Sequence, residues 1–386
     1  MKNFVVNVFY KWFVLRTMSI NKLVDPGQVY IIGQYEVGTA NPTPFYKIGI
    51  VQNDRSSEAR VNEHQTGNPN RLFIAKKIKC EASYMVEQQM HRKWNGVRIG
   101  KEWFNLANPS DLATVEQDIN NFDAQYGPKI VQLRPIYYAT PTPGDNSTLS
   151  PADRTRAEQI RDAAFLLTER LGLYKYLYNT YEYQLKLANG TQPIMDSVTT
   201  ATYRPPETKF STSKLPAKLK SQFMNKPRKN KDDFRFNFVG VTANIDLLKL
   251  DDPHWKNKYA AEFATWSTEK AAWAAMDSTI VHASTNYSIR PRTSSDEQLH
   301  QKFLDAKDMF EQLRVELEVL KLECKILCGS YEKINDVCTW KRSSQTKEFN
   351  LKEFQLKCPV EYADPAHYST SKEKVSVKVV PYKTYA

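Results

Sequence analysis

The sequence predicts an α/β (α+β) multidomain protein, with a small N-terminal sheet flanked by helices and tandem α+β modules after it. Three observations lead to this expectation. The length of 386 residues suits two or three domains. Strand-like and helix-like segments alternate along residues 28–122. The remaining chain repeats one ordered pattern at an offset of about 140 residues, which indicates a duplication.

Residues 1–27 are expected to form an N-terminal arm. Lys11 and Arg16 interrupt its apolar run, and no small-residue cleavage site follows, so a signal peptide is not expected. The run is also too short and too charged to span a bilayer. Residues 1–17 are either an extension upstream of the true start or an amphipathic arm, and we expect a cytoplasmic protein that does not contact a membrane.

Residues 28–125 are expected to form one compact domain. Apolar runs with Gly-rich and Asn-rich boundaries predict strands, and apolar residues at helical spacing predict helices. Val86, Met90 and Trp94 form such a buried helical stripe. The expected order is strand 29–35, strand 45–50, helix 55–65, strand 72–80, helix 82–94, strand 101–106 and helix 109–122.

A Pro-rich and Gly-rich linker is expected at residues 126–151, followed by a first α+β module (152–245), a Trp/Ala-rich helical connector (246–297) and a second α+β module (298–386). Each module copy begins with a helix that stops at a glycine, Gly190 or Gly329. An aromatic residue beside a cation follows on a strand, as Thr202-Tyr203-Arg204 or Thr339-Trp340-Lys341. Such pairs can stack on bases and contact phosphate, or the ring can pack under its own helix.

The composition indicates the kind of binding partner and the redox state of the cysteines. A net charge of +11 and a pI near 9.2 favour a polyanionic partner, above all nucleic acid, although a basic protein without such a partner is the alternative. The five cysteines are sparse and form no C-x-x-C pair, so reduced thiols are expected. Cys324 and Cys328 could hold a metal only if two more ligands lay nearby.

The N-terminal domain offers a candidate for each task in phosphodiester hydrolysis. A base must take a proton from water, a divalent cation needs a carboxylate ligand, and a fixed cation must meet the developing charge. The candidates are Tyr30 and Lys47 on paired strands, Arg60 and His64 on one helix face, and Glu87 and His91 on the next helix.

Each candidate also has an ordinary structural alternative. Tyr30 could be a half-buried strand tyrosine, and Lys47 could be a solvated lysine on an edge strand. Arg60 could simply pair with Glu58 or Glu63 on its helix. His64 and Glu87 could be surface residues, and His91 could tune Glu87, support the fold or do neither.

The segments "VYII", "YKIGI" and "EWF", in order with Arg60 and Glu87, resemble the GIY-YIG nuclease superfamily over residues 28–115, in the branch common in phages and large DNA viruses. The resemblance implies a small sheet flanked by helices and one metal ion, Mg²⁺ or Mn²⁺. It implies that Tyr30 is a general base or an orienting group and that Glu87 is the metal ligand. Arg60 would face the phosphate, His64 would assist proton transfer, Lys47 replaces a second tyrosine, and Asn105 is a loose match to a late asparagine.

The tandem copies more weakly resemble the tail of YqaJ-type viral exonucleases, without an exonuclease core. The expected function is therefore that of a phage-encoded, metal-dependent DNA endonuclease. Its nucleic-acid contacts are expected from Arg60, Tyr203, Arg204, Trp340 and Lys341. The alternative is a non-catalytic component of a viral particle or replication complex that keeps a nuclease fold and binds nucleic acid or a viral partner protein. The oligomeric state stays open.

Overall fold

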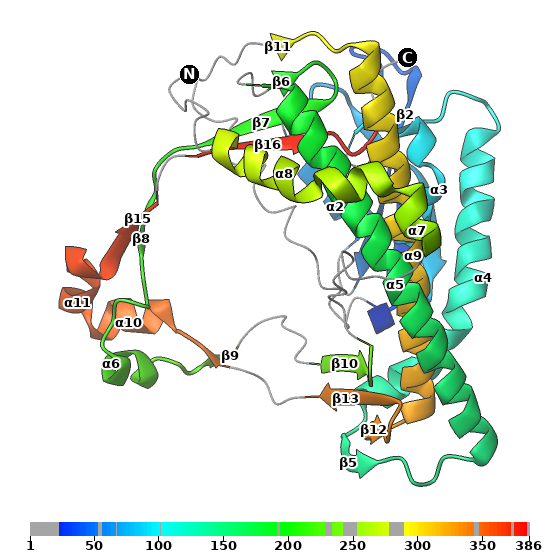
Figure 1. The fold of residues 1–386 in the computed structure, drawn as a ribbon, viewed down its shortest axis with the longest axis vertical. Coiled ribbons are helices and arrows are strands. Elements are labelled where there is room, and N and C mark those ends of the chain that lie inside the picture. Colours follow the sequence, from blue (N-terminus) through cyan, green and yellow to red (C-terminus); the bar gives the residue numbers. More distant parts are fainter. Residues whose placement is uncertain are drawn as a thin grey trace.

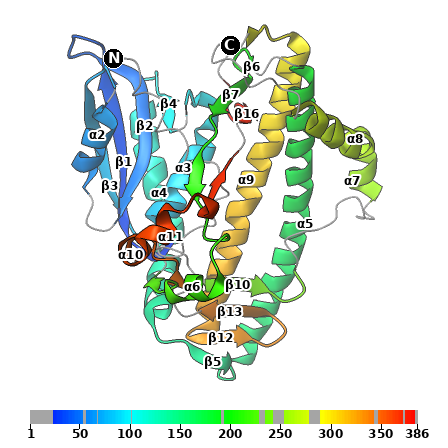
Figure 2. The same cartoon turned by 90° about the vertical axis from the view of Figure 1, so that its left-hand side faces the viewer.

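The computed structural model describes residues 23–52, 56–66, 68–100, 102–190, 194–227, 234–241, 253–277, 289–342, 347–371 and 374–383. The predicted mixed α+β class is confirmed. Figure 1 shows two long helices running the length of the molecule and an arm of short strands and helices to their left. Figure 2, turned by 90°, shows the N-terminal sheet beside the long helices. Most of the arm predicted at residues 1–27 lies outside the described residues.

The N-terminal sheet has four antiparallel strands in the order β3-β1-β2-β4. These are β1 (Gly27–Tyr35), β2 (Pro42–Gln52), β3 (Leu72–Cys80) and β4 (Trp103–Asn105). The central strand β1 buries the five residues from Val29 to Gly33, because both of its faces are covered. All four strands fall where the apolar runs predict them.

Three helices accompany this sheet: α2 (Ser57–Gln65), α3 (Ser83–Lys93) and α4 (Asp111–Tyr138), with a short 3₁₀ turn η1 (Asn95–Val97) after α3. The Ser56 side chain caps α2 by accepting a hydrogen bond from the Ala59 amide. The predicted stripe on α3 is buried at Val86 and Met90, and Trp94 packs against the same core.

The stretch expected as a linker, residues 126–151, is structured. Its first half continues α4, and Thr142–Asp145 forms β5, which pairs with a strand nearly two hundred positions later in the chain. The reason is burial, because Tyr126, Ile130 and Leu133 lie in the main core. The Pro-rich composition of this stretch suggested a loop, but Pro128 and Pro135 are accommodated within the helix.

The two long helices are α5 (Pro151–Ala188) and α9 (Ser294–Cys328), which lie side by side in opposite directions (Figures 1 and 2). The main core is continuous from the N-terminal sheet into this pair. It contains Met90 and Phe104 of the first domain together with Leu322 of α9 and Trp340 of a later strand. The first domain and α9 therefore stabilise each other through one shared core.

The remaining elements come from the two predicted module copies. The first contributes β6 (Ile194–Met195), β7 (Thr199–Arg204), β8 (Thr208–Phe210), α6 (Ala217–Gln222), β9 (Lys226–Pro227) and β10 (Phe234–Phe238). The second contributes β12 (Tyr331–Ile334), β13 (Cys338–Arg342), β14 (Lys347–Glu348), α10 (Leu351–Lys357), α11 (Pro359–Ala363), η3 (Pro365–His367), β15 (Tyr368–Thr370) and β16 (Lys374–Val379).

The copies are interleaved rather than placed side by side. Strand β7 pairs with β16, β8 with β15, β9 with β14 and β10 with β13. Between the copies lie α7 (Pro253–Lys258), α8 (Ala260–Asp277) and β11 (Ile289–Arg290). The tryptophans of α7 and α8 pack on the aromatic residues of α5, so the expected helical connector is a cover for that helix. In the described part of the chain, no helix is both long and apolar enough to cross a lipid bilayer.

We predict that Gly49→Ala lowers the free energy of unfolding by about 1–3 kcal/mol, because small-to-large changes in a packed core cost that much. Gly49 lies directly opposite Tyr30 in the β1–β2 register, and a Cβ there would overlap the Tyr30 hydroxyl and ring. Denaturant unfolding measures the change. Gly96→Ala is the matched control, since a Cβ at Gly96 meets open space. Equal effects of the two substitutions would contradict this packing.

Candidate active site

Tyr30 lies at the centre of the sheet with its side chain 1% exposed. Its hydroxyl lies over β2 in the space that the missing side chain of Gly49 leaves, and it is hydrogen-bonded to Arg60. Burial raises the pKa of Tyr30 to about 12, although Arg60 acts in the opposite direction. The phenol is therefore protonated at neutral pH, which favours an orienting role over that of a general base.

Lys47 is buried on β2 and forms an ion pair with Glu102, which directly precedes β4. Strand β2 lies between β1 and β4, so Lys47 is not an edge-strand lysine. Burial alone would raise the pKa of Glu102, but the Lys47 ammonium lowers it below the ordinary range. Glu102 was present in the "EWF" segment, yet sequence reasoning gave it no role, because nothing in the sequence shows that it faces Lys47.

Arg60 and His64 project from the same face of α2, one turn apart. The Arg60 guanidinium bonds to Glu63 at 2.6 Å, as the structural alternative predicted, and also to Tyr30. Burial and the positive charges of Lys47 and Arg60 lower the pKa of His64 to about 4. Its Nε2 atom is enclosed without a hydrogen-bond partner. His64 is therefore neutral at neutral pH.

Glu87 lies on α3 with 8% of its surface exposed, close enough to Tyr30 for its charge to act on that phenol. It is thus not the exposed helix glutamate of the ordinary alternative. His91, one turn later, places Nε2 at 2.8 Å from the Ile48 carbonyl oxygen and its ring 5.5 Å from that of Phe104. Among the roles left open for His91, these contacts favour support of the fold, because they tie α3 to β2.

The predicted N-terminal residues converge. Tyr30 contacts Arg60 and feels the charges of Glu87 and Glu102, and His64 feels those of Lys47 and Arg60. The late asparagine, Asn105, ends β4 with its Oδ1 atom buried and without a partner. The sheet, α2 and α3 therefore bring a phenol, two cations, an imidazole and two carboxylates into one neighbourhood.

The residues predicted to bind nucleic acid in the tandem copies differ in how far they are exposed. Trp340 is fully buried in the main core, so its ring cannot stack on a base, and this prediction is corrected. Tyr203 is half-buried, Arg204 is exposed, and the Lys341 side chain lies outside the described residues. A constant offset of 139 positions aligns Trp340 with Ala201 rather than Tyr203, so the sequence alignment was two residues out of register.

A metal ion at this site would take few ligands from the protein. Among the described residues, no group of three or more His, Cys, Asp and Glu side chains is arranged to hold a metal, and Cys324 and Cys328 are buried and form no disulfide. The Glu87 carboxylate is a hard oxygen donor. It suits Mg²⁺, which usually keeps several waters and takes one or two carboxylates together with substrate phosphate oxygens.

We predict that His91 makes stability depend on pH. Burial lowers its pKa to about 4 in the folded protein, against about 6.5 when unfolded. The unfolded chain therefore binds the extra proton between those values, and stability falls as the pH drops through this window, by about 3 kcal/mol in all. His91→Gln keeps a donor for Ile48 but does not titrate, so its unfolding free energy should change less between pH 7 and pH 4.

Urea unfolding at pH 7, 6, 5 and 4 checks this expectation, with His254→Gln on the exposed face of α7 as control. If wild type and His91→Gln lose stability in parallel, His91 is not the group that titrates.

Comparison with known families agrees with the geometry. Residues 27–122 match the family model of the T5orf172 domain, a domain found in phage proteins and in some nuclease-like proteins. No curated protein and no solved structure matches the chain. The matched segment runs from β1 into α4 and contains every residue of the candidate site. Over these residues the chain is therefore similar to a phage-associated, nuclease-like family.

Proposed function

We propose that residues 27–122 are the catalytic domain of a metal-dependent, GIY-YIG-type endonuclease that hydrolyses DNA phosphodiester bonds in a phage setting. The observation that carries this proposal is the convergence of Tyr30, Lys47, Arg60 and Glu87 around one another. The family match over the same residues supports it. DNA is the proposed partner because the chain carries a net charge of +11.

The two cations would meet the phosphate in different ways. The pair between Arg60 and Glu63 is partly exposed, and such a pair is worth only about 0–1 kcal/mol. An incoming phosphate can therefore displace Glu63 and take the planar fork of Arg60. Lys47 stays paired with Glu102 below the site and contributes a fixed positive charge that needs no rearrangement during the reaction.

His64 is the proposed general base, and Tyr30 is proposed to orient the attacking water or the phosphate. His64 is neutral at neutral pH, so its enclosed nitrogen is available to accept a proton. A pKa near 4 makes a weak base, but it is held low in part by Lys47 and Arg60. A bound phosphate anion offsets those charges and raises the pKa of His64 toward the working pH.

Glu87 would hold the proposed Mg²⁺ or Mn²⁺ ion. When bound, the ion supplies charge neutralisation at the phosphate and lowers the pKa of a coordinated water. The position of Glu87 beside Tyr30 is set by α3, which is fastened to β2 through His91 and to α9 through a contact between Gln88 and Arg314 at 3.3 Å. The tandem region thus supports the helix that carries the proposed metal ligand.

We predict that Glu87→Gln abolishes Mg²⁺- or Mn²⁺-dependent nicking of plasmid DNA while the protein stays folded, because an amide is a much poorer ligand for a hard cation. Nicking assays across a series of metal concentrations, with circular dichroism for the fold, measure this. The control is Glu116→Gln, a surface carboxylate paired with Lys76. Undiminished cleavage by Glu87→Gln, with unchanged metal dependence, would remove Glu87 from the metal role.

We predict that substitutions at the buried ion pair of Lys47 and Glu102 affect stability and cleavage differently. Lys47→Met leaves the Glu102 carboxylate buried without its partner and should cost about 3–5 kcal/mol of stability. Adding Glu102→Gln removes that charge, so the double variant should recover most of the loss. Its cleavage rate should stay down by about 100-fold or more, since the fixed cation is missing.

Unfolding and nicking measured on both variants separate the structural role of Lys47 from its catalytic role. A double variant that cleaves as fast as wild type would exclude Lys47 from the reaction. If the wild-type chain binds DNA or a viral partner protein but shows no cleavage with either cation, the alternative function as a non-catalytic scaffold replaces this proposal.

A further inference from the structure

The two tandem copies match each other position by position. Both helices stop at a glycine with positive φ, Gly190 (66°) and Gly329 (61°), and both following turns hold a non-glycine residue in that region, Ser197 (58°) and Asp336 (62°). Each pair is 139 positions apart. These unusual backbone conformations recur because the same structural unit occurs twice.

The same offset continues into the arm. One apolar cluster contains four pairs of residues that are each 139 positions apart: Phe210 with Phe349, Leu215 with Phe354, Leu219 with Cys358, and Phe223 with Tyr362. Equivalent residues of the two copies thus pack against one another in a single small core. This arrangement is expected around a two-fold axis, where a surface meets its own equivalent.

Hydrogen bonds repeat with the same symmetry. The Val198 amide donates to Met195 at 3.0 Å, and the Val337 amide donates to Ile334 at 3.0 Å. Val380 donates to Val198 at 2.8 Å, and its counterpart Val239 donates to Val337 at 2.8 Å. Since β7 pairs with β16 as β13 pairs with β10, each copy gives its last strand to the other copy.

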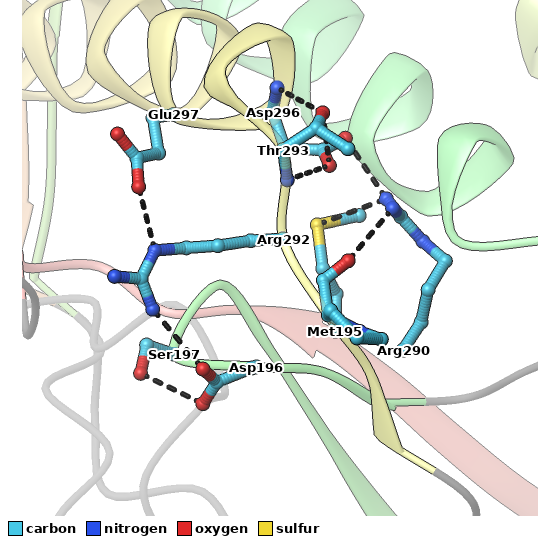
Figure 3. Close-up of polar contacts among 9 residues, drawn as sticks. Met195, Asp196, Ser197, Arg290, Arg292, Thr293, Asp296 and Glu297 are labelled. Atoms are coloured by element: carbon cyan, nitrogen blue, oxygen red, sulfur yellow. Dashed lines mark hydrogen bonds and ion pairs between the residues drawn. The ribbon is translucent and has the colours of Figure 1, made fainter.

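The ends of the long helices are fastened across the copies as well. Figure 3 shows Arg292 bridging Asp196, in the turn of the first copy, to Glu297 of α9, at 3.0 and 2.7 Å. In the reciprocal joint, Asp145, just before α5, accepts hydrogen bonds from the amide and the side chain of Asn335, in the turn of the second copy, at 2.7 and 2.8 Å.

The outer sides of α5 and α9 differ in what covers them. On α5, Tyr176 stacks on a ring of α8, and Gln184 bonds to a carboxylate of α8. At the equivalent positions of α9, 139 residues later, Val315 lies in the core shared with the N-terminal domain, and Glu323 pairs with a lysine of α4. Figure 2 shows α8 outside α5 and the N-terminal sheet beyond α9. Two equivalent positions thus carry a catalytic domain and a helix.

From these observations we propose that residues 142–380 are a dimer fused into one chain, so that the protein works as a monomer whose nuclease site nicks one strand per encounter with duplex DNA. The interface that two separate copies would form is completed within the chain. In the part of the chain that the structure describes, the proposed catalytic domain occurs once, and it packs against α9. The nicking half of the proposal rests on the proposed function.

A single site gives nicks because the two strands of a duplex run in opposite directions. In-line attack requires one orientation of the phosphate relative to Arg60 and Glu87. The second strand presents the reverse orientation, so its cleavage requires release and rebinding. A two-fold scaffold permits binding in either direction, and the second cut then follows as an independent, later event.

The test uses the full chain at limiting concentration on supercoiled plasmid with Mg²⁺ or Mn²⁺. Nicked circles should accumulate first, linear DNA should follow with a lag, and the initial rate should be first order in protein. The chain should also be monomeric by light scattering at the assay concentration, with or without cleavage. Glu87→Gln is the control for contaminating nucleases.

Linear DNA without a lag, a rate that rises with the square of the protein concentration, or a dimer by light scattering would each overturn the proposal. Absence of any cleavage would instead count against the proposed function, and with it against nicking of one strand per encounter. The light-scattering result would then test the remaining part of the proposal, that residues 142–380 are a fused dimer.

Discussion

The packing of α5 along α9 is the constraint on which the rest of the structure depends. These helices run in opposite directions, so the strands that follow each of them start at opposite ends of the molecule and meet as they run toward one another. The four reciprocal strand pairs and the arm core exist because of this direction. The outer side of α9 then supports α3 and α4, and with them the helix that carries Glu87. Residues more than two hundred positions away in the sequence therefore support the helices of the candidate site.

The charge states of the site residues follow from their burial in this structure. A lysine at the centre of a sheet is tolerated only with a carboxylate beside it, and Glu102 supplies that partner on the adjacent strand. The two cations keep His64 neutral, and burial keeps Tyr30 protonated. Without substrate, each positive charge is thus balanced by a carboxylate of the protein itself. In the proposed reaction, a phosphate would change this balance most at Arg60, because its partner Glu63 is the more exposed of the two carboxylates.

Local sequence pattern was enough to predict the parts of the fold that depend on local contacts. The spacing of apolar residues along the sequence predicts the strands around Tyr30 and Lys47 and the helix stripe at Val86 and Met90. The order of these strands and helices predicts that the site residues converge. The role of Glu102 and the helical path through residues 126–138 could not be predicted, because they depend on partners that only the tertiary structure brings close. The prediction for Trp340 was wrong because the two copies were aligned two residues out of register. A shift of two residues leaves each side chain on the same face of its strand, so Tyr203 and Trp340 looked equivalent although their burial differs.

The duplication also gives an internal comparison within one chain. Where both copies keep a feature, as with the glycine stops and the arm cluster, the feature serves the shared scaffold. Where the two copies differ in what packs against them, the difference indicates a role that only one copy has. The α5 side meets Phe263, Trp266 and Trp273 of α8, whereas the α9 side meets the domain that bears Tyr30 and Lys47. A symmetric scaffold that carried two catalytic domains would address both strands of a duplex at once. In the proposed nuclease, α8 covers the second position, so the symmetric scaffold would present its chemistry to one strand.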